Sequence, residues 1–205
     1  MSFQFHYAEK DFYPRKIETE RLILKKIPAG DYPIGAVVEF MNTSGVEEAF
    51  ETYPYEVPNT EEKARDFLEK RRYENRKGEN CTYLFELQET KYPFVGELVI
   101  KVQEQNVAEL GFWISSDYWG NGYCPEAAKA VIGLLLKEKD FENIEVQTTK
   151  SNKKAQRAIE KFIIPLGGEK SGERETTLGE EAEYSDSDEE ITVVEYKVAR
   201  ENFQG

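Results

Sequence analysis

Hydrophobic positions along the chain switch between a period of two and a helical period. Residues 17–27, "IETERLILKKI", predict a first strand, with Leu22 and Leu24 on one face and Ile23 on the other. Residues 59–72, "NTEEKARDFLEKRR", predict a helix with Asn59 or Thr60 as its cap, acidic residues in its first turn and basic residues in its last. An earlier helix is predicted from apolar residues at helical spacing, namely Ile34, Val37, Val38 and Met41.

The middle of the chain is rich in strands. Three hydrophobic runs, at residues 81–88, 94–103 and 107–115, are separated by short polar loops, so they predict an antiparallel meander. The later elements are predicted as a helix, a strand, a helix and a strand at residues 125–140, 143–149, 152–163 and 191–199. Strands followed by alternating helices and strands predict an α+β domain with a mixed sheet.

Composition and length fit one folded domain over residues 1–205. The chain is 39% hydrophobic and 13% aromatic, which is enough for a core. Residues 1–16 are expected to form an N-terminal arm. Residues 171–190, "SGERETTLGEEAEYSDSDEE", are acidic and poor in large apolar side chains. We expect a solvated hairpin loop or a disordered insertion there, with a docking arm for a basic partner as the alternative.

The charge balance limits the classes of partner. A net charge of −13 opposes non-specific binding to nucleic acid and to anionic membranes, and it suits cationic partners. No apolar run approaches the roughly 20 residues of a membrane-spanning helix. The N-terminus does not resemble a signal peptide, and Cys81 and Cys124 have neither metal-ligand nor disulfide-framework spacing. We therefore expect a cytoplasmic protein with no metal, no nucleic-acid partner and no membrane contact.

The stretch "ELGFWISSDYWGNGYCPEAAKAVIG" joins a strand to a helix through a Gly-X-Gly turn. The first backbone N–H groups of a helix have no intrahelical acceptor, and Gly120 and Gly122 let the main chain approach a bulky anion. Pro125 suits the first helical turn. Together with the helix dipole, these features favour a pyrophosphate site, although Gly-X-Gly also occurs in ordinary turns. The sequence matches neither a P-loop nor a Rossmann fingerprint.

Four segments resemble the GNAT superfamily of acyl-CoA-dependent N-acetyltransferases, in its ribosomal-protein-acetyltransferase-like (Rim-type) branch. They are "ETERLIL", "VGELVI", "AELGFWISSDYWGNGYCPEAAKAVI" and "NKKAQRAIEKF", and together they span most of residues 17–200. The resemblance implies a mostly antiparallel central sheet with helices on both faces. It also implies a splayed pair of strands that forms a cleft for acetyl-CoA.

Candidate CoA-binding residues follow from this resemblance. The strand ending at Phe112, Trp113 and Ile114 would hydrogen-bond the pantetheine arm through its backbone. Asn152 matches an asparagine that contacts CoA in related enzymes, and it is equally suited to capping the helix that follows it. The pyrophosphate would bind main-chain N–H groups of the loop formed by Trp119, Gly120, Asn121, Gly122, Tyr123 and Cys124.

The sequence departs from the family pattern at several positions. Asp117 stands where Gln or Arg often begins the pyrophosphate loop, and Ala155 replaces a serine that could protonate the leaving thiolate. The usual "KLGF" ending is replaced by "KFIIPLGG", which could move the final hairpin. Cys124 is expected to be a small packing residue rather than a nucleophile, although a helix start would lower the pKa of its thiol.

Acetyl transfer to an amine also needs a proton acceptor and an oxyanion stabiliser. Glu109 and Glu97 lie in predicted strands beside the cleft, and either could be the base directly or through water; the alternative is that both are solvated strand carboxylates. A backbone N–H of Trp113 or Ile114 would polarise the thioester carbonyl. His6 is the only histidine, which excludes a typical histidine triad. By resemblance, Tyr53 and Tyr55 lie in a region that shapes the acceptor pocket.

The sequence thus predicts an acetyl-CoA-dependent N-acetyltransferase, active as a monomer or homodimer. Its acceptor would be a primary amine, either a protein N-terminus or a small polyamine-like or amino-sugar compound. The departure at Ala155 keeps open a non-catalytic CoA-binding regulatory protein of the same fold. A third hypothesis is that the acidic segment makes the chain chiefly an interaction module.

Overall fold

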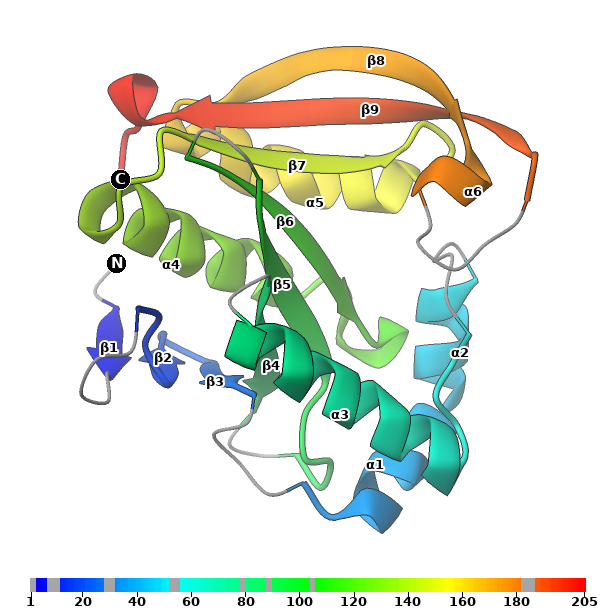
Figure 1. The fold of residues 1–205 in the computed structure, drawn as a ribbon. Helices are drawn as coiled ribbons and strands as arrows, with labels where there is room; N and C mark the ends of the chain where they lie inside the picture. The colour runs from blue at the N-terminus through cyan, green and yellow to red at the C-terminus, as the bar shows by residue number, and fades with distance from the viewer. Residues whose placement is uncertain are drawn as a thin grey trace.

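A single twisted sheet forms the centre of the molecule. The computed structural model describes residues 3–6, 12–27, 32–51, 56–77, 80–87, 90–103, 106–181 and 187–205. Among these residues, nine strands pair in the order β1-β2-β3-β4-β5-β6-β7-β9-β8, and only β6 and β7 run parallel. The strands are β1 (Gln4–His6), β2 (Lys16–Glu18), β3 (Ile23–Lys26), β4 (Asn80–Glu86), β5 (Gly96–Val102), β6 (Val107–Ile114), β7 (Asn143–Thr149), β8 (Glu169–Thr177) and β9 (Glu190–Ala199) (Figure 1).

Helices cover both faces of this sheet, as predicted. Trp113 of β6 packs against Phe40 and Phe50, at ring-centroid distances of 6.3 and 4.8 Å. The preceding residue, Phe112, packs edge-on against Phe162 at 5.9 Å. Because consecutive strand residues point to opposite faces, Phe40 and Phe50 lie on one face and Phe162 on the other. The helices are α1 (Ile34–Met41), α2 (Ser44–Phe50), α3 (Glu61–Lys77), α4 (Tyr123–Glu138), α5 (Lys153–Ile163) and α6 (Leu178–Glu181).

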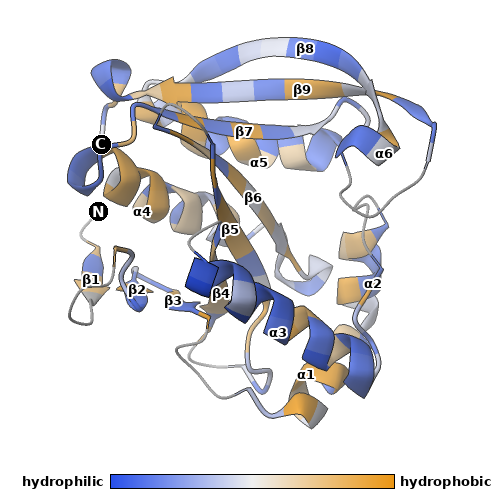
Figure 2. Cartoon of the chain, viewed as in Figure 1, coloured by the Kyte–Doolittle hydropathy of each residue, from blue (hydrophilic) through white to orange (hydrophobic). Residues whose placement is uncertain are grey.

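Helix α4 carries much of the hydrophobic core. Its predicted inward face, Ala127, Val131, Leu134 and Leu135, is fully buried. Figure 2 shows apolar residues gathered on α4 and on the central strands, whereas α3 and β8 are mostly hydrophilic. Burying aliphatic side chains at about 25 cal/mol per Å² of apolar surface favours this packing strongly. The helix that begins at the Gly-X-Gly turn is therefore held firmly in place.

The predicted meander is confirmed. Strands β4, β5 and β6 are antiparallel neighbours, with Glu97 opposite Trp113 and Leu98 opposite Phe112. The Ser115 N–H donates to the Val95 carbonyl at 3.0 Å. Alternate residues of the ladder, Ser115 and Trp113, therefore direct their backbone polar groups towards β5. Since hydrogen-bonded and non-bonded pairs alternate in an antiparallel ladder, the backbone polar groups of Phe112 and Ile114 point away from β5.

The parallel pair β6–β7 separates halfway along its length. Pairing is confined to Val107–Asn143, Ala108–Ile144 and Glu109–Glu145, although β6 continues to Ile114 and β7 to Thr149. Figure 1 shows β6 diverging from β7. The predicted splay of two strands is thus confirmed, and beyond Glu109 the backbone polar groups of β6 that point away from β5 are directed into the gap.

The first predicted strand proved to be a hairpin. Residues 17–27 divide into β2 and β3, which pair antiparallel around a turn at residues 19–22. In this turn the Thr19 N–H donates to the Leu22 carbonyl at 3.0 Å, and the Leu22 N–H donates to Thr19 Oγ1 at 3.0 Å. A side-chain hydroxyl thus supplies a local acceptor that competes with an extended strand. Part of the expected N-terminal arm, Gln4–His6, pairs with β2 as β1.

Helix α2 was not predicted. No helix or strand was predicted between α1 and α3, but residues 44–50 are helical. Val46, Ala49 and Phe50 are buried at helical spacing after Thr43, so the signal was present but short. Helix α3 begins after Thr60 as predicted, and the Thr60 hydroxyl accepts from the Lys63 N–H at 3.3 Å.

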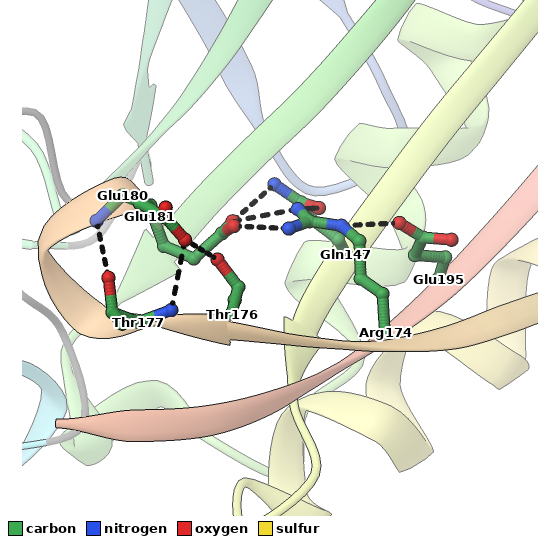
Figure 3. Close-up of polar contacts among 7 residues, drawn as sticks. All are labelled: Gln147, Arg174, Thr176, Thr177, Glu180, Glu181 and Glu195. Carbon is green, nitrogen blue, oxygen red and sulfur yellow. Dashed lines mark hydrogen bonds and ion pairs between the residues drawn. The ribbon is translucent and has the colours of Figure 1, made fainter.

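The expectation of a loop or disordered insertion at residues 171–190 was wrong for most of the described part. Residues 171–177 belong to β8, which pairs with β9, and Leu178–Glu181 form α6; residues 182–186 lie outside the described part of the chain. Figure 3 shows Arg174 between Glu181, Glu195 and Gln147. Its guanidinium donates to them at 2.5, 2.7 and 2.9 Å respectively. Arg174 thus neutralises part of the acidic charge where β8 forms the edge of the sheet beside β9.

Candidate active site

A cavity of about 610 Å³ lies at the open end of the split between β6 and β7. It is bounded by the end of β6, the turn before α4 and the start of that helix, one face of α5 and part of α2. Nine of the ten predicted CoA-contacting residues line it: Phe112, Trp113, Ile114, Trp119, Gly120, Gly122, Tyr123, Cys124 and Asn152. The tenth, Asn121, lies within the same turn but is not part of the lining. The fold thus brings together residues that are up to 40 positions apart in the chain (152 − 112).

The turn at residues 119–122 has a defined backbone geometry. Gly120 and Gly122 have φ values of +79° and +78°, in the left-handed region that L residues rarely adopt. The Trp119 indole N–H donates to the Ile114 carbonyl at 2.9 Å, and Asn121 Nδ2 donates to the Tyr118 and Trp119 carbonyls at 3.1 and 3.2 Å. These bonds fasten the turn to the end of β6.

Helix α4 starts directly from this turn. Gly122 precedes its first residue, Tyr123, and Pro125 lies in the first turn. The leading N–H groups of a helix have no intrahelical acceptors, and the helix dipole places a partial positive charge there. A Cβ built on Gly120 would meet no atom within 4 Å, so the turn is open on that side. The arrangement can hold an anion with main-chain donors.

Basic side chains surround this anion site although the chain as a whole is acidic. Among the described residues, the lining contains four cations, Lys153, Lys154, Arg157 and Lys161, and two carboxylates, Glu48 and Glu51. The four cations lie on α5, so the local field is opposite in sign to the net charge of −13. An anionic ligand is therefore favoured at this cavity.

Lys154 and Glu48 connect the two walls of the cavity. Lys154 Nζ lies 3.2 Å from Glu48 Oε1 and 4.1 Å from the centroid of the Trp119 ring. Hydrogen bonds from Ser116 and then from Lys154 lower the pKa of Glu48. A lower pKa means a weaker base, so Glu48 is a poorer proton acceptor than an ordinary glutamate. Glu48 was not among the predicted site residues, because α2 was not predicted.

Asn152 has the structural role that the sequence allowed. Its Oδ1 accepts from the Ala155 N–H at 2.9 Å and caps α5, while the residue also lines the cavity. Ala155 lines the cavity as well, so a methyl group stands at the position for which the family resemblance implied a hydroxyl. The lining hydroxyls are those of Tyr118, Tyr123 and Ser151.

Cys124 is a buried, free thiol. It is 8% exposed, and burial raises its pKa to about 12. The expectation that a helix start would lower this pKa was wrong in direction, because removal of the thiolate from water outweighs the helix dipole here. The expected packing role agrees with its position in the core.

The two candidate bases lie outside the described lining of the cavity. Glu97 is 1% exposed and accepts from Arg71 Nη2 at 2.8 Å. Glu109 lies in the paired part of β6, where Lys101 Nζ donates to it at 3.3 Å. The geometry therefore does not bring either carboxylate to the cavity directly, and a base role through water stays a prediction. Tyr53 and Tyr55 lie outside the described residues.

No group of three or more His, Cys, Asp or Glu side chains that could hold a metal ion occurs in the described part of the chain. Within that same part, no helix combines the length and the apolar character that crossing a membrane requires.

Known proteins share this sequence pattern and fold. The family model described as "Acetyltransferase (GNAT) domain" matches residues 21–162. "Uncharacterized protein YkkB" of Bacillus subtilis (strain 168) is 32% identical over 72 residues, covering 34% of this chain and 42% of the relative's length. A GNAT-family acetyltransferase from Bacillus anthracis superposes with a TM-score of 0.68 at 24% identity, covering 91% of this chain and 99% of that one.

RimJ of Mycobacterium smegmatis, solved in complex with CoA-disulfide, has the same fold. Its TM-score is 0.65 at 16% identity, covering 88% of this chain and 82% of that one. At this level of identity the likeness shows only that the two folds are similar. The family model, in contrast, matches most of the chain. The chain therefore belongs to the GNAT acetyltransferase family.

Proposed function

We propose that this protein is an acetyl-CoA-dependent N-acetyltransferase that transfers the acetyl group directly to a primary amine. The observation that carries the proposal is the continuous cavity between the open edge of β6 and the turn at residues 119–122. An edge of unpaired backbone groups beside a main-chain anion site suits a ligand with an amide-containing arm and a pyrophosphate.

The residues present fit acetyl-CoA. The open polar groups of Phe112 and the N–H of Ile114 would bond the pantetheine arm, as a neighbouring strand would. Main-chain N–H groups of the turn and of the start of α4 would hold the pyrophosphate. The cations of α5 supply charge for the remaining phosphate. Asn152 would act chiefly by holding the start of α5 beside the ligand.

The transfer itself needs few protein groups. The amine nitrogen attacks the thioester carbonyl carbon, the carbon–sulfur bond breaks, the nitrogen loses one proton, and the CoA sulfur gains one. The N–H of Ile114, directed into the split, is placed to stabilise the oxyanion, whereas the ladder pattern directs that of Trp113 towards β5. Glu109 or Glu97, acting through water, remains the proposed proton acceptor.

The acceptor is proposed to be a protein N-terminus or a small amine. The cytoplasmic location, the monomeric or homodimeric state and the absence of nucleic-acid and membrane partners also remain proposals. The decisive experiment incubates the purified protein with acetyl-CoA and a panel of N-terminal peptides, polyamines and amino sugars. Free CoA thiol and the acetylated product are then measured. Turnover with at least one primary amine supports the proposal, and absence of acetyl-CoA binding in calorimetry would overturn it.

Ala155 favours one alternative, a non-catalytic CoA-binding protein of the same fold. The methyl group at this position cannot protonate the leaving thiolate. The described lining also contains the hydroxyl-bearing residues Tyr118, Tyr123 and Ser151, so it holds other side chains that could donate a proton. Tight CoA binding without turnover on any amine of the panel would support the alternative.

A further inference from the structure

The "ETERL" motif has a structural partner at the start of α4. Its turn at residues 19–22 faces Glu126, which lies in the first turn of that helix. Thr19 Oγ1 donates to Glu126 Oε1 at 2.6 Å, and the Arg21 backbone N–H donates to the same oxygen at 2.9 Å. Arg21 Nε and Nη2 lie 2.7 and 2.6 Å from the other oxygen, Oε2. The carboxylate is 6% exposed and receives donors on both oxygens.

Arg21 also contacts the turn that precedes α4. Its Nη1 donates to the Asn121 carbonyl at 2.8 Å, and its guanidinium carbon lies 4.9 Å from the centroid of the Tyr123 ring. A Cβ built on Gly122 would lie 3.6 Å from Arg21 Nη2. One side chain thus bonds the residue before Gly122, packs on the residue after it, and bonds the helix that follows.

These contacts have two consequences for a bound anion. The Asn121 carbonyl is held towards Arg21, which fixes the peptide planes of a turn that contains two left-handed glycines. Glu126 would otherwise place an uncompensated negative charge in the first turn of α4, next to the anion site, and Arg21 neutralises it. The ion pair therefore sets both the shape and the charge of that site.

We propose that Arg21 is a positioning residue for the pyrophosphate-binding turn, acting through Glu126 and the Asn121 carbonyl. The inference rests on the proposed binding of acetyl-CoA. It assigns to the N-terminal hairpin a part in cofactor recognition, although Arg21 is not part of the described cavity lining. Arg21 is suited to this role because its planar fork bonds a carboxylate and a carbonyl at once, which a lysine cannot reproduce.

The test compares Arg21→Met, Arg21→Lys and Glu126→Gln with the wild type. Lys25→Met is the matched control. Lys25 lies on β3 of the same hairpin and forms a 2.6 Å ion pair with Glu86 of β4. Two acetyl donors are used, acetyl-CoA and acetyl-pantetheine, of which only the first carries a pyrophosphate. Loss of charge-assisted hydrogen bonds to the turn should raise the Kd and KM for acetyl-CoA about tenfold or more in Arg21→Met.

The kcat at saturating acetyl-CoA and the kcat/KM for acetyl-pantetheine should stay close to wild type. Arg21→Lys should recover only part of the affinity, and Lys25→Met should match the wild type. General destabilisation would impair both donors equally, and that result would overturn the inference. If Arg21→Met does not fold, Arg21→Lys and Glu126→Gln decide by the same comparison of donors.

The two proposals fail in different ways. Wild-type protein that does not bind acetyl-CoA overturns the proposed function, and this inference falls with it. Wild-type protein that binds acetyl-CoA, with folded Arg21 variants of unchanged affinity, overturns only the positioning role. A selective loss of acetyl-CoA affinity supports both.

Discussion

Arg71 of α3 forms an ion pair with the buried carboxylate of Glu97 on β5. Its Nη2 and Nε lie 2.8 and 3.4 Å from the two carboxylate oxygens, and Nη1 lies 3.3 Å from Glu74. Glu97 is opposite Trp113 in the ladder, beside the end of β6 that borders the cavity. The ion pair therefore ties α3 to β5, the neighbour of the strand that lines the cavity.

Removal of one partner of this pair should destabilise the protein strongly. In Arg71→Met the 1%-exposed Glu97 carboxylate would remain buried without its main cation, which typically costs about 3–5 kcal/mol. Urea unfolding should show this loss in the free energy of unfolding. Arg71→Met combined with Glu97→Leu should recover much of the loss, because the double variant no longer buries the Glu97 carboxylate, and Glu74 keeps its ion pair with Lys70 at 3.6 Å. Equal or greater destabilisation in the double variant would contradict this explanation.

Gly120 and Gly122 should tolerate no side chain. Their φ values of +79° and +78° are costly for an L residue by roughly 1–2 kcal/mol each, so Gly→Ala at either position should distort the turn. We expect calorimetry to show an acetyl-CoA Kd raised about tenfold. Gly133→Ala is the matched control, since Gly133 lies within α4 with no atom within 4 Å of a built Cβ. That control should keep its affinity and gain slightly in stability.

Cys124 should make the protein sensitive to alkali. Its folded pKa is about 12, whereas an unfolded thiol ionises near pH 8.5. Above about pH 8.5 the unfolded state therefore binds fewer protons than the folded state, and the free energy of unfolding falls as pH rises, by at most about 1.4 kcal/mol per pH unit. Below that pH the thiol is neutral in both states and contributes no slope.

Cys124→Ala tests this directly. Urea unfolding between about pH 8 and about pH 10.5 should show a shallower loss of stability in the variant than in the wild type. Buried tyrosines contribute to the remaining slope in both proteins, since burial also raises the pKa of Tyr196 to about 12. Identical slopes in the two proteins would show that the thiol ionises freely in the fold.

Glu109→Gln tests the proposed base. If Glu109 removes the amine proton through water, kcat should fall by about 10²–10⁴ while the Kd for acetyl-CoA stays constant. The deficit should narrow as pH rises, because more of the amine then arrives deprotonated. Glu145→Gln is the control, since Glu145 is exposed and pairs with Glu109 across the β6–β7 ladder. Wild-type kcat in Glu109→Gln would leave Glu97 as the remaining candidate.

Lys154 should contribute to cofactor affinity in a salt-dependent manner. Lys154→Met removes a cation from the cavity lining and the bond to Glu48. We expect KM for acetyl-CoA to rise about three- to tenfold at low salt and less at high salt. Lys150→Met removes another exposed lysine, paired with Glu173 at 2.7 Å outside the described lining, and should leave KM unchanged. A rise in KM that is equal at low and high salt would exclude the electrostatic explanation.

Local sequence patterns predicted most helices and strands, and they predicted the turn at residues 119–122 that is proposed to bind acetyl-CoA. The meander, α4, α5 and the Gly-X-Gly junction follow from periodicity and turn chemistry, which act over a few residues. The resemblance carried by residues 108–132 and 152–162 identified nine residues that the fold then placed around one cavity. The hairpin at residues 17–27 and the helix at 44–50 were missed because a hydroxyl-capped turn and a seven-residue helix give weak local signals.

The sequence by itself therefore determined the family, the order of most strands and helices, and the Gly-X-Gly turn for which anion binding is proposed. Tertiary structure decided what depends on pairing between distant segments. It set Glu97 against Arg71, directed the Ile114 N–H into the split, and turned the acidic segment into an edge strand around Arg174. It also placed the cations of α5 around the cavity of an acidic chain. Charge, burial and ladder register depend on which segments become neighbours, so only the folded chain fixes them.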